Sequence, residues 1–256
     1  MRKRQKMVLS AILLAVGLVG VQSLPLEIRY VLIGVLGIVS WLLSGWSLKE
    51  GLSGIEWITS TLPSVLFTVA VGMFYILLPP AWWARVLIAL VFAVGQYALL
   101  LTANIFSVAA IRTIALFRAA SAVGFVMTLV TGFLLFDTIF SFRLFFPYIG
   151  MSVALVSFLL LLPALWSVEL QSKISGRVAT YCMWLSLYMG IIAMSITFLP
   201  ISISVSSLFL STILYVFMGI SQHQFADRLF AKTVGEYVTV GVAVTITMLA
   251  TVGWGV

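Results

Sequence analysis

Long apolar runs, separated by short polar or proline-containing segments, dominate the hydropathy pattern of this chain. About 20 apolar residues cross the hydrocarbon core of a bilayer as a helix, and proline, glycine and charge clusters mark helix boundaries. The predicted spans cover approximately residues 7–22, 29–46, 61–78, 84–103, 119–140, 147–166, 179–199, 204–220 and 237–254. The pattern therefore predicts an all-α, polytopic transmembrane helical bundle of about nine spans, within a range of eight to ten, that forms a single domain over residues 1–256.

Composition leads to the same class. The chain is 63% apolar and only 8% charged, with a mean hydropathy of +1.23, whereas soluble domains average roughly 45–50% apolar and about 25% charged residues. These values exclude intrinsic disorder and leave no segment for a soluble domain, so we expect a multi-pass protein of the cell membrane.

The first apolar segment follows a run of basic residues, MRKRQK. A basic start followed by a short apolar core is also the pattern of a secretory signal peptide. We expect an uncleaved first helix, and the topology of the later spans is the same in either case.

The charge distribution predicts the orientation of the chain. Its net charge of +7 comes from 14 basic and seven acidic residues, and basic residues in short loops mark the cytoplasmic side of a membrane protein. With the N-terminus inside and the C-terminus outside, eleven basic residues lie inside and only three lie outside: Arg2, Lys3, Arg4, Lys6, Lys49, Arg112, Arg118, Lys173, Arg177, Arg228 and Lys232 against Arg29, Arg85 and Arg143. The positive charge thus serves orientation, and no nucleic acid is expected as a partner.

Residues 104–118 decide this count, because a further span there would invert every later loop. Two arginines near the centre of a span cost about 5–7 kcal/mol, and the seven apolar residues of the stretch return only about 2–4 kcal/mol. We therefore predict an interfacial amphipathic helix over residues 104–118, between spans four and five. Its polar residues Asn104, Arg112 and Arg118 are candidates for binding anionic lipid head groups or a partner subunit.

Sequence motifs for catalysis are missing. The chain contains no GxxxxGK[ST], GxGxxG, HExxH, GxSxG or EF-hand pattern. Its single cysteine, Cys182, permits no intrachain disulfide, and its single histidine, His223, excludes a site with several histidines. No cofactor is expected, and the absence of motifs favours a protein that is not an enzyme.

Two polar residues inside the predicted spans are candidates for a transport pathway, because polar and ionisable groups within a membrane often serve function. Gln96 lies near the middle of the fourth span, and Asp137 lies toward the outer end of the fifth. The structural alternative for Gln96 is a hydrogen bond to a neighbouring helix. For Asp137 the alternatives are a position shallow enough to reach the interface and an ion pair with Arg143.

Four further residues are candidates for acid–base chemistry on a lipid-linked substrate. His223 and Asp227 are four positions apart, so we expect them to share a helix face, where they could relay a proton or supply two metal ligands. Glu169 or Glu236 would have to complete such a site, and Glu27 is the corresponding candidate outside. The structural alternative is an exposed helix with ion pairs.

Three segments carry a resemblance: NIFSVAAIRTIALFRAA, SLFLSTILYVFMGISQHQFADRLF and GEYVTVGVAV. The chain resembles, from about residue 60 onward, an uncharacterised family of polytopic membrane proteins from candidate-phyla bacteria. The resemblance implies a bacterial inner-membrane location, and because the family has no assigned activity it implies no mechanism.

The function we expect is that of a non-enzymatic scaffold or complex subunit whose basic cytoplasmic face binds anionic lipids or other membrane-protein subunits. A small secondary transporter and a membrane-embedded enzyme acting on a lipid-linked substrate remain open as alternatives.

Overall fold

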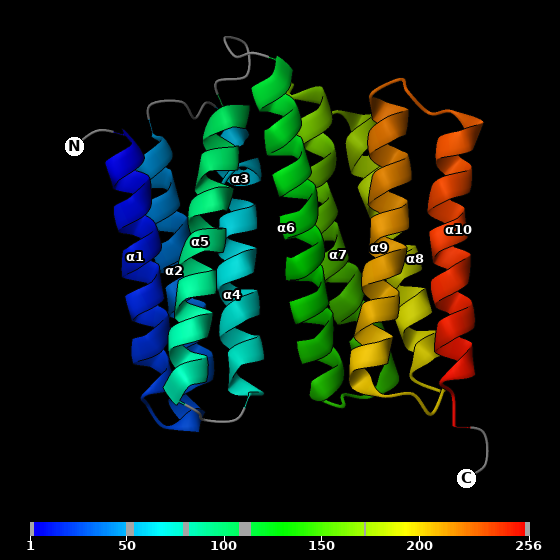
Figure 1. Ribbon diagram of the computed structural model, residues 1–256, viewed down its shortest axis with the longest axis horizontal. Coiled ribbons are helices and arrows are strands. Elements are labelled where there is room, and N and C mark those ends of the chain that lie inside the picture. The colour runs from blue at the N-terminus through cyan, green and yellow to red at the C-terminus, as the bar shows by residue number, and fades with distance from the viewer. Residues whose placement is uncertain (1–2, 50–53, 79–81, 108–113, 172, 254–256) are drawn as a thin grey trace. The chain divides into compact units, whose positions relative to one another are not determined.

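The computed structural model describes residues 3–49, 54–78, 82–107, 114–171 and 173–253. Regular secondary structure in these ranges is entirely helical (Figure 1). The helices are α1 (Lys3–Gln22), α2 (Leu26–Leu48), α3 (Glu56–Thr59), α4 (Leu62–Ile76), α5 (Trp82–Phe106), α6 (Ile114–Ser141), α7 (Phe146–Glu169), α8 (Gly176–Ile196), α9 (Ile203–Phe225) and α10 (Ala231–Ala250). Counting α3 and α4 as one segment, nine helices in the described ranges are long and apolar enough to cross a membrane, which confirms the all-α class and the predicted number of spans.

Most helices extend beyond the predicted apolar segments. The 25 residues of α5 correspond to about 37 Å at 1.5 Å per residue, which exceeds the hydrocarbon core of roughly 30 Å but fits within a bilayer that includes its head groups. Polar helix ends can therefore lie at head-group depth. The last helix shows the same effect, because α10 begins at Ala231 and so includes Lys232 and Glu236.

The predicted interfacial helix over residues 104–118 is wrong at both of its described ends. Asn104 belongs to α5, which continues to Phe106, and Arg118 belongs to α6, which begins at Ile114. Residues 108–113, which include Arg112, lie outside the described residues. Asn104 and Arg118, which the sequence places on a surface helix, thus belong to the two long helices α5 and α6.

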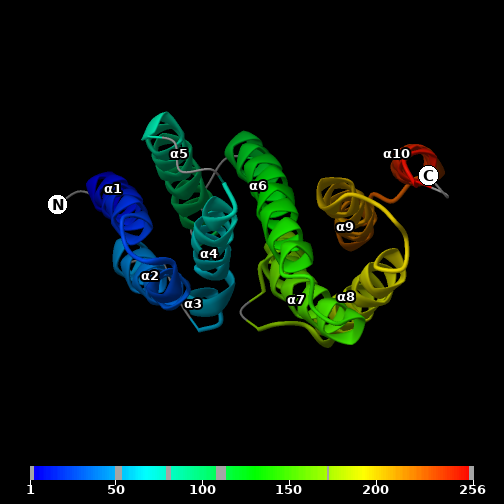
Figure 2. The ribbon, with the colours of Figure 1, turned by 90° about the horizontal axis from the view of Figure 1, so that it is seen from below.

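The chain divides into two compact units, residues 1–131 and 132–256. In the first unit, α1, α2, α4 and α5 pack on one another as a bundle of four helices (Figure 2). Its apolar core includes Leu14, Leu18, Phe67 and Phe92, and the last two rings stack with their centroids 5.6 Å apart. The expectation of one membrane domain over the whole chain stays a prediction.

In the second unit, α7 packs along α8, and α9 contacts α7, α8 and α10. Small residues permit the close approach of α7 and α8: a Cβ atom added to Gly190 would lie 2.7 Å from the backbone oxygen of Gly150. Trp166, Leu161 and Leu165 are the largest fully buried side chains of α7. Buried residues occur along α7 from Ile149 to Ser167, so this helix is enclosed over several turns.

Candidate functional site

The most extensive polar contact inside the first unit joins α2, α4 and α5. It consists of Ser40, Ser44, Ser64, Thr68 and Gln96, which we call the hydroxyl–amide cluster, and each of these side chains is at most 2% exposed. The Oγ atoms of Ser44 and Ser64 are 2.8 Å apart, and the Thr68 hydroxyl donates to Ser40 Oγ at 3.0 Å. Nε2 of Gln96 donates to Ser40 Oγ at 3.2 Å and also to Ser64 Oγ.

Nearly every polar atom of the hydroxyl–amide cluster has a partner within it. The exception is Oε1 of Gln96, which is buried without a hydrogen-bond partner. In hydrocarbon a polar side chain is stabilised chiefly by such interhelical hydrogen bonds. The arrangement therefore matches the structural alternative for Gln96, a bond to neighbouring helices. Sequence reasoning missed Ser64 and Thr68, although their spacing of four places both on one helix face.

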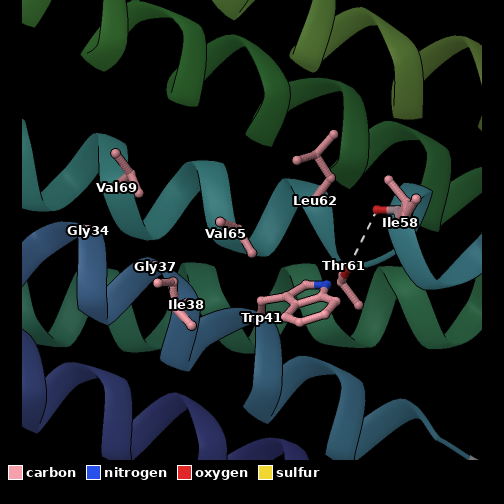
Figure 3. Close-up of a pocket in the computed structure, with 9 residues that line it drawn as sticks. All are labelled: Gly34, Gly37, Ile38, Trp41, Ile58, Thr61, Leu62, Val65 and Val69. Atoms are coloured by element: carbon pink, nitrogen blue, oxygen red, sulfur yellow. Dashed lines mark hydrogen bonds between the residues drawn. The ribbon is translucent and has the colours of Figure 1, made fainter.

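A groove of about 300 Å³ runs between α2 and α4 (Figure 3). Ile58 lies at one end of it, Gly34 and Val69 lie at the other, and the indole of Trp41 lies opposite Leu62, toward the Ile58 end (Figure 3). The complete lining is Gly34, Gly37, Ile38, Trp41, Ile58, Thr61, Leu62, Val65 and Val69. None of these residues belongs to the hydroxyl–amide cluster, so this groove does not connect Gln96 to a polar path.

Asp137, on the part of α6 that belongs to the second unit, is buried. Its carboxyl lies near the side chain of Ser207 on α9, whose hydroxyl donates to the backbone oxygen of Ile203 at 2.8 Å. Arg143, which is exposed after the end of α6, forms no ion pair with Asp137, although the structure describes both residues. The predicted alternative of an Asp137–Arg143 pair is therefore wrong, because the carboxyl faces a neighbouring helix instead.

Replacing Asp137 with asparagine is expected to preserve stability, because the amide keeps the shape of the side chain and removes the need to desolvate a carboxylate. Asp137→Leu, which places a larger, branched side chain at this buried position, is expected to cost about 1–3 kcal/mol. Thermal denaturation of the purified protein in detergent measures both variants. An asparagine variant as unstable as the leucine variant would contradict this description of the site.

The predicted helix face shared by His223 and Asp227 is wrong. Helix α9 ends at Phe225, and Asp227 has a left-handed backbone with φ of 53°, so the two side chains do not follow one helix. Nδ1 of His223 is 2.8 Å from the backbone oxygen of Gly219, and its ring packs against Tyr237 of α10 with centroids 5.7 Å apart. This histidine therefore holds α9 against α10.

The remaining acid–base candidates are Glu169 in the second unit and Glu27 in the first. Among the residues that the structure describes, no three His, Cys, Asp or Glu side chains come close enough to hold a metal ion. Glu169 is half-buried in the last turn of α7, and Glu27 is exposed in the first turn of α2.

Of the three residues predicted to bind lipid or a partner, only Arg118 is described as exposed. Asn104 is buried, and its Oδ1 has no hydrogen-bond partner, so its assignment to a lipid-facing surface is wrong: α5 turns it into the bundle. Arg112 lies outside the described residues.

A site that the sequence did not indicate lies between α1 and α5. It is an open groove of about 630 Å³, which we call the α1–α5 groove, and its lining residues are Arg4, Gln5, Val8, Leu9, Ile12 and Tyr97. Beneath Tyr97 lies a small apolar cluster of Met7, Leu48, Leu100 and Ala103. The groove thus presents one exposed cation above an apolar floor.

The fold and these sites define a multi-pass α-helical membrane protein. Comparison with protein-family models, with curated proteins and with solved structures finds no match to this chain. A function is therefore argued from the geometry alone.

Proposed function

We propose that the protein is a non-catalytic scaffold or complex subunit of the bacterial inner membrane that binds anionic lipids at its basic, cytoplasmic end. The observation that carries this proposal is the α1–α5 groove, in which Arg4 stands above apolar side chains. An anionic phospholipid has the complementary chemistry, since its phosphate is negative and its acyl chains are apolar.

The dimensions of the groove support a lipid. Arg4, Val8 and Ile12 follow one another at spacings of four on the same side of α1, and this stripe is about 12 Å long at 1.5 Å per residue. A head group on Arg4 would therefore leave room for part of an acyl chain along Val8 and Ile12. Arg4 has no carboxylate partner among the described residues.

Other exposed basic residues of the first unit lie at the same end as Arg4, which supports lipid binding at this end. Within the first unit, α1 begins, α2 ends and α6 begins at the end that carries Arg4 (Figure 1). Lys49 and Arg118 are exposed there. Each basic residue near an anionic membrane surface contributes about 1 kcal/mol of attraction, so several together favour a surface rich in anionic lipid. The charge count that predicts a cytoplasmic N-terminus agrees with this orientation.

The experiment is retention of phosphatidylglycerol by the purified protein, measured by native mass spectrometry. Arg4→Gln is expected to weaken retention about fivefold, the effect of removing about 1 kcal/mol of attraction. Arg143→Gln is the matched control, because it removes another exposed arginine far along the chain from the groove. Equal retention by the Arg4 variant and wild type would reject the groove as a lipid site.

The rest of the basic end is tested in parallel. Replacing Arg112 and Arg118 together with glutamine is expected to weaken binding of the protein to liposomes that contain anionic lipid. If the double variant binds these liposomes like wild type and retains any co-purifying subunit, Arg112 and Arg118 are not part of the binding surface. The proposal then rests on Arg4 alone.

A further inference from the structure

Four polar side chains, one from each helix of the first unit's bundle, lie at the end opposite to Arg4. They are Gln22 at the end of α1, Arg29 in α2, Tyr75 at the end of α4 and Arg85 at the start of α5. Figure 2 views the bundle from this end. We call this group the Arg29–Arg85 site.

Hydrogen bonds connect the first two members of the site. Nη1 of Arg29 donates to Oε1 of Gln22 at 3.5 Å, and its Nε donates to the backbone oxygen of Leu24 at 2.7 Å. A guanidinium group has five N–H donors, so these bonds leave three of them available. The guanidinium is thereby held in place while part of it remains free for a ligand.

The other members add a hydroxyl and a second cation. The positive charges that act on the Tyr75 hydroxyl are those of Arg85, most strongly, and of Arg29. Tyr75 is 5% exposed and Gln22 is 4% exposed. The Tyr75 hydroxyl and the Nε2 atom of Gln22 are both buried without a hydrogen-bond partner. Two buried neutral groups therefore lie within reach of positive charge: the Gln22 amide contacts Arg29, and Arg85 is the cation that acts most strongly on the Tyr75 hydroxyl.

No carboxylate among the described residues pairs with either arginine. Glu27, the acid closest to Arg29 in the sequence, is exposed. Arg29 and Arg85 are themselves half-buried, and a partly desolvated cation without a counter-charge is unfavourable. A bound anion would offset this cost.

The depth of the site limits which anions can reach it. Trp82 and Trp83 at the start of α5 are 78% and 60% exposed, and exposed tryptophans at helix ends mark the interface between membrane and water. The Arg29–Arg85 site thus lies at the depth of lipid head groups, where both a lipid phosphate and a soluble phosphate can enter.

We propose that the Arg29–Arg85 site binds a phosphate group, which the two guanidinium groups hold with help from the Tyr75 hydroxyl and the Gln22 amide. Arginine matches phosphate because its fork of N–H donors can bond two phosphate oxygens at once. This site lies at the opposite end of the bundle from the α1–α5 groove, so it does not depend on the proposed lipid-binding function.

The test measures thermal denaturation of the full chain in detergent as a function of added ligand. The two probes are potassium phosphate, compared with potassium chloride at equal ionic strength, and dioctanoyl phosphatidic acid. Saturable stabilisation by both probes identifies a site for phosphate groups in general. Stabilisation by phosphatidic acid alone identifies a lipid head-group site. If neither probe stabilises the wild-type protein, the proposal is overturned.

Variants locate the binding. Arg29→Gln and Arg85→Gln are each expected to weaken the apparent affinity about tenfold or more, the effect of one charge-assisted hydrogen bond. Tyr75→Phe, which keeps the ring packing, is expected to weaken it less. Arg143→Gln is the control that should bind both probes like wild type. Should either arginine variant be too unstable to measure, the Tyr75 variant decides: unchanged affinity in a folded Tyr75→Phe protein overturns the assigned site.

Discussion

Gly190→Ala is expected to destabilise the second unit by about 1–3 kcal/mol, the usual cost of inserting a methyl group into a packed interior. The added Cβ atom would lie 2.7 Å from the backbone oxygen of Gly150 and 2.9 Å from Cβ of Ala154. A backbone atom cannot move aside as a side chain can, so α7 and α8 would have to separate. Thermal denaturation in detergent measures the loss.

Gly235→Ala is the matched control for this variant. Gly235 lies within α10 of the same unit, and a Cβ atom added there meets no other atom within 4 Å. Alanine is a better helix former than glycine by roughly 0.5–1 kcal/mol, so this control is expected to be neutral or stabilising. If Gly190→Ala were as stable as Gly235→Ala, the close crossing of α7 and α8 would be refuted.

Ser64→Ala is expected to destabilise the first unit by about 1–3 kcal/mol, the cost of leaving a buried polar group without its partner. Ser64 is the centre of the hydroxyl–amide cluster, because Ser40, Ser44 and Gln96 all bond its hydroxyl. The variant removes the hydroxyl on α4 that Ser44 of α2 contacts. It also removes one of the two hydroxyl acceptors of the Gln96 amide. The same thermal measurement applies.

Ser157→Ala provides a control that changes residue type in the same way. Ser157 is fully buried in α7, and its hydroxyl has no hydrogen-bond partner, so its removal is expected to be neutral or stabilising. Combining Ser64→Ala with Gln96→Leu should cost less than the sum of the two single changes, because both act on one network. Strict additivity would show that Gln96 and Ser64 do not interact.

The proposed binding sites use related chemistry at two ends of the first unit. Arg4 stands above an apolar groove that suits an acyl chain, whereas Arg29 and Arg85 flank buried polar atoms that suit a compact anion. The cross-controls keep the sites separate, since Arg4→Gln should change phosphatidylglycerol retention and leave phosphate binding at Arg29 and Arg85 intact.

The predicted spans agree with the helices because each helix satisfies its own backbone hydrogen bonds and needs only a long apolar segment to cross a bilayer. That information is local and can be read from the sequence. The failures also have local causes. The apolar segment ends at residue 103, which places Asn104 on a surface helix, whereas helix α5 continues to Phe106 and buries Asn104.

His223 and Asp227 show a second limit. Their spacing of four would bring them together only in an unbroken helix, and α9 ends between them at Phe225. Hydropathy predicts which segment is apolar enough to cross a membrane, but it does not predict the residue at which the helix ends beyond that segment, as at Phe225 of α9.

The amino-acid sequence by itself determined that the chain is an all-α membrane protein with nine apolar helices in its described part, because length and hydropathy of single segments decide this. Only the tertiary structure decided which polar residues meet. Gln96 joins serines that precede it by 56 and 32 positions, and Gln22, Arg29, Tyr75 and Arg85 come from four different helices. Contacts of this kind depend on how each helix is rotated about its own axis. Packing between helices sets that rotation, and the sequence of a single segment specifies it only weakly.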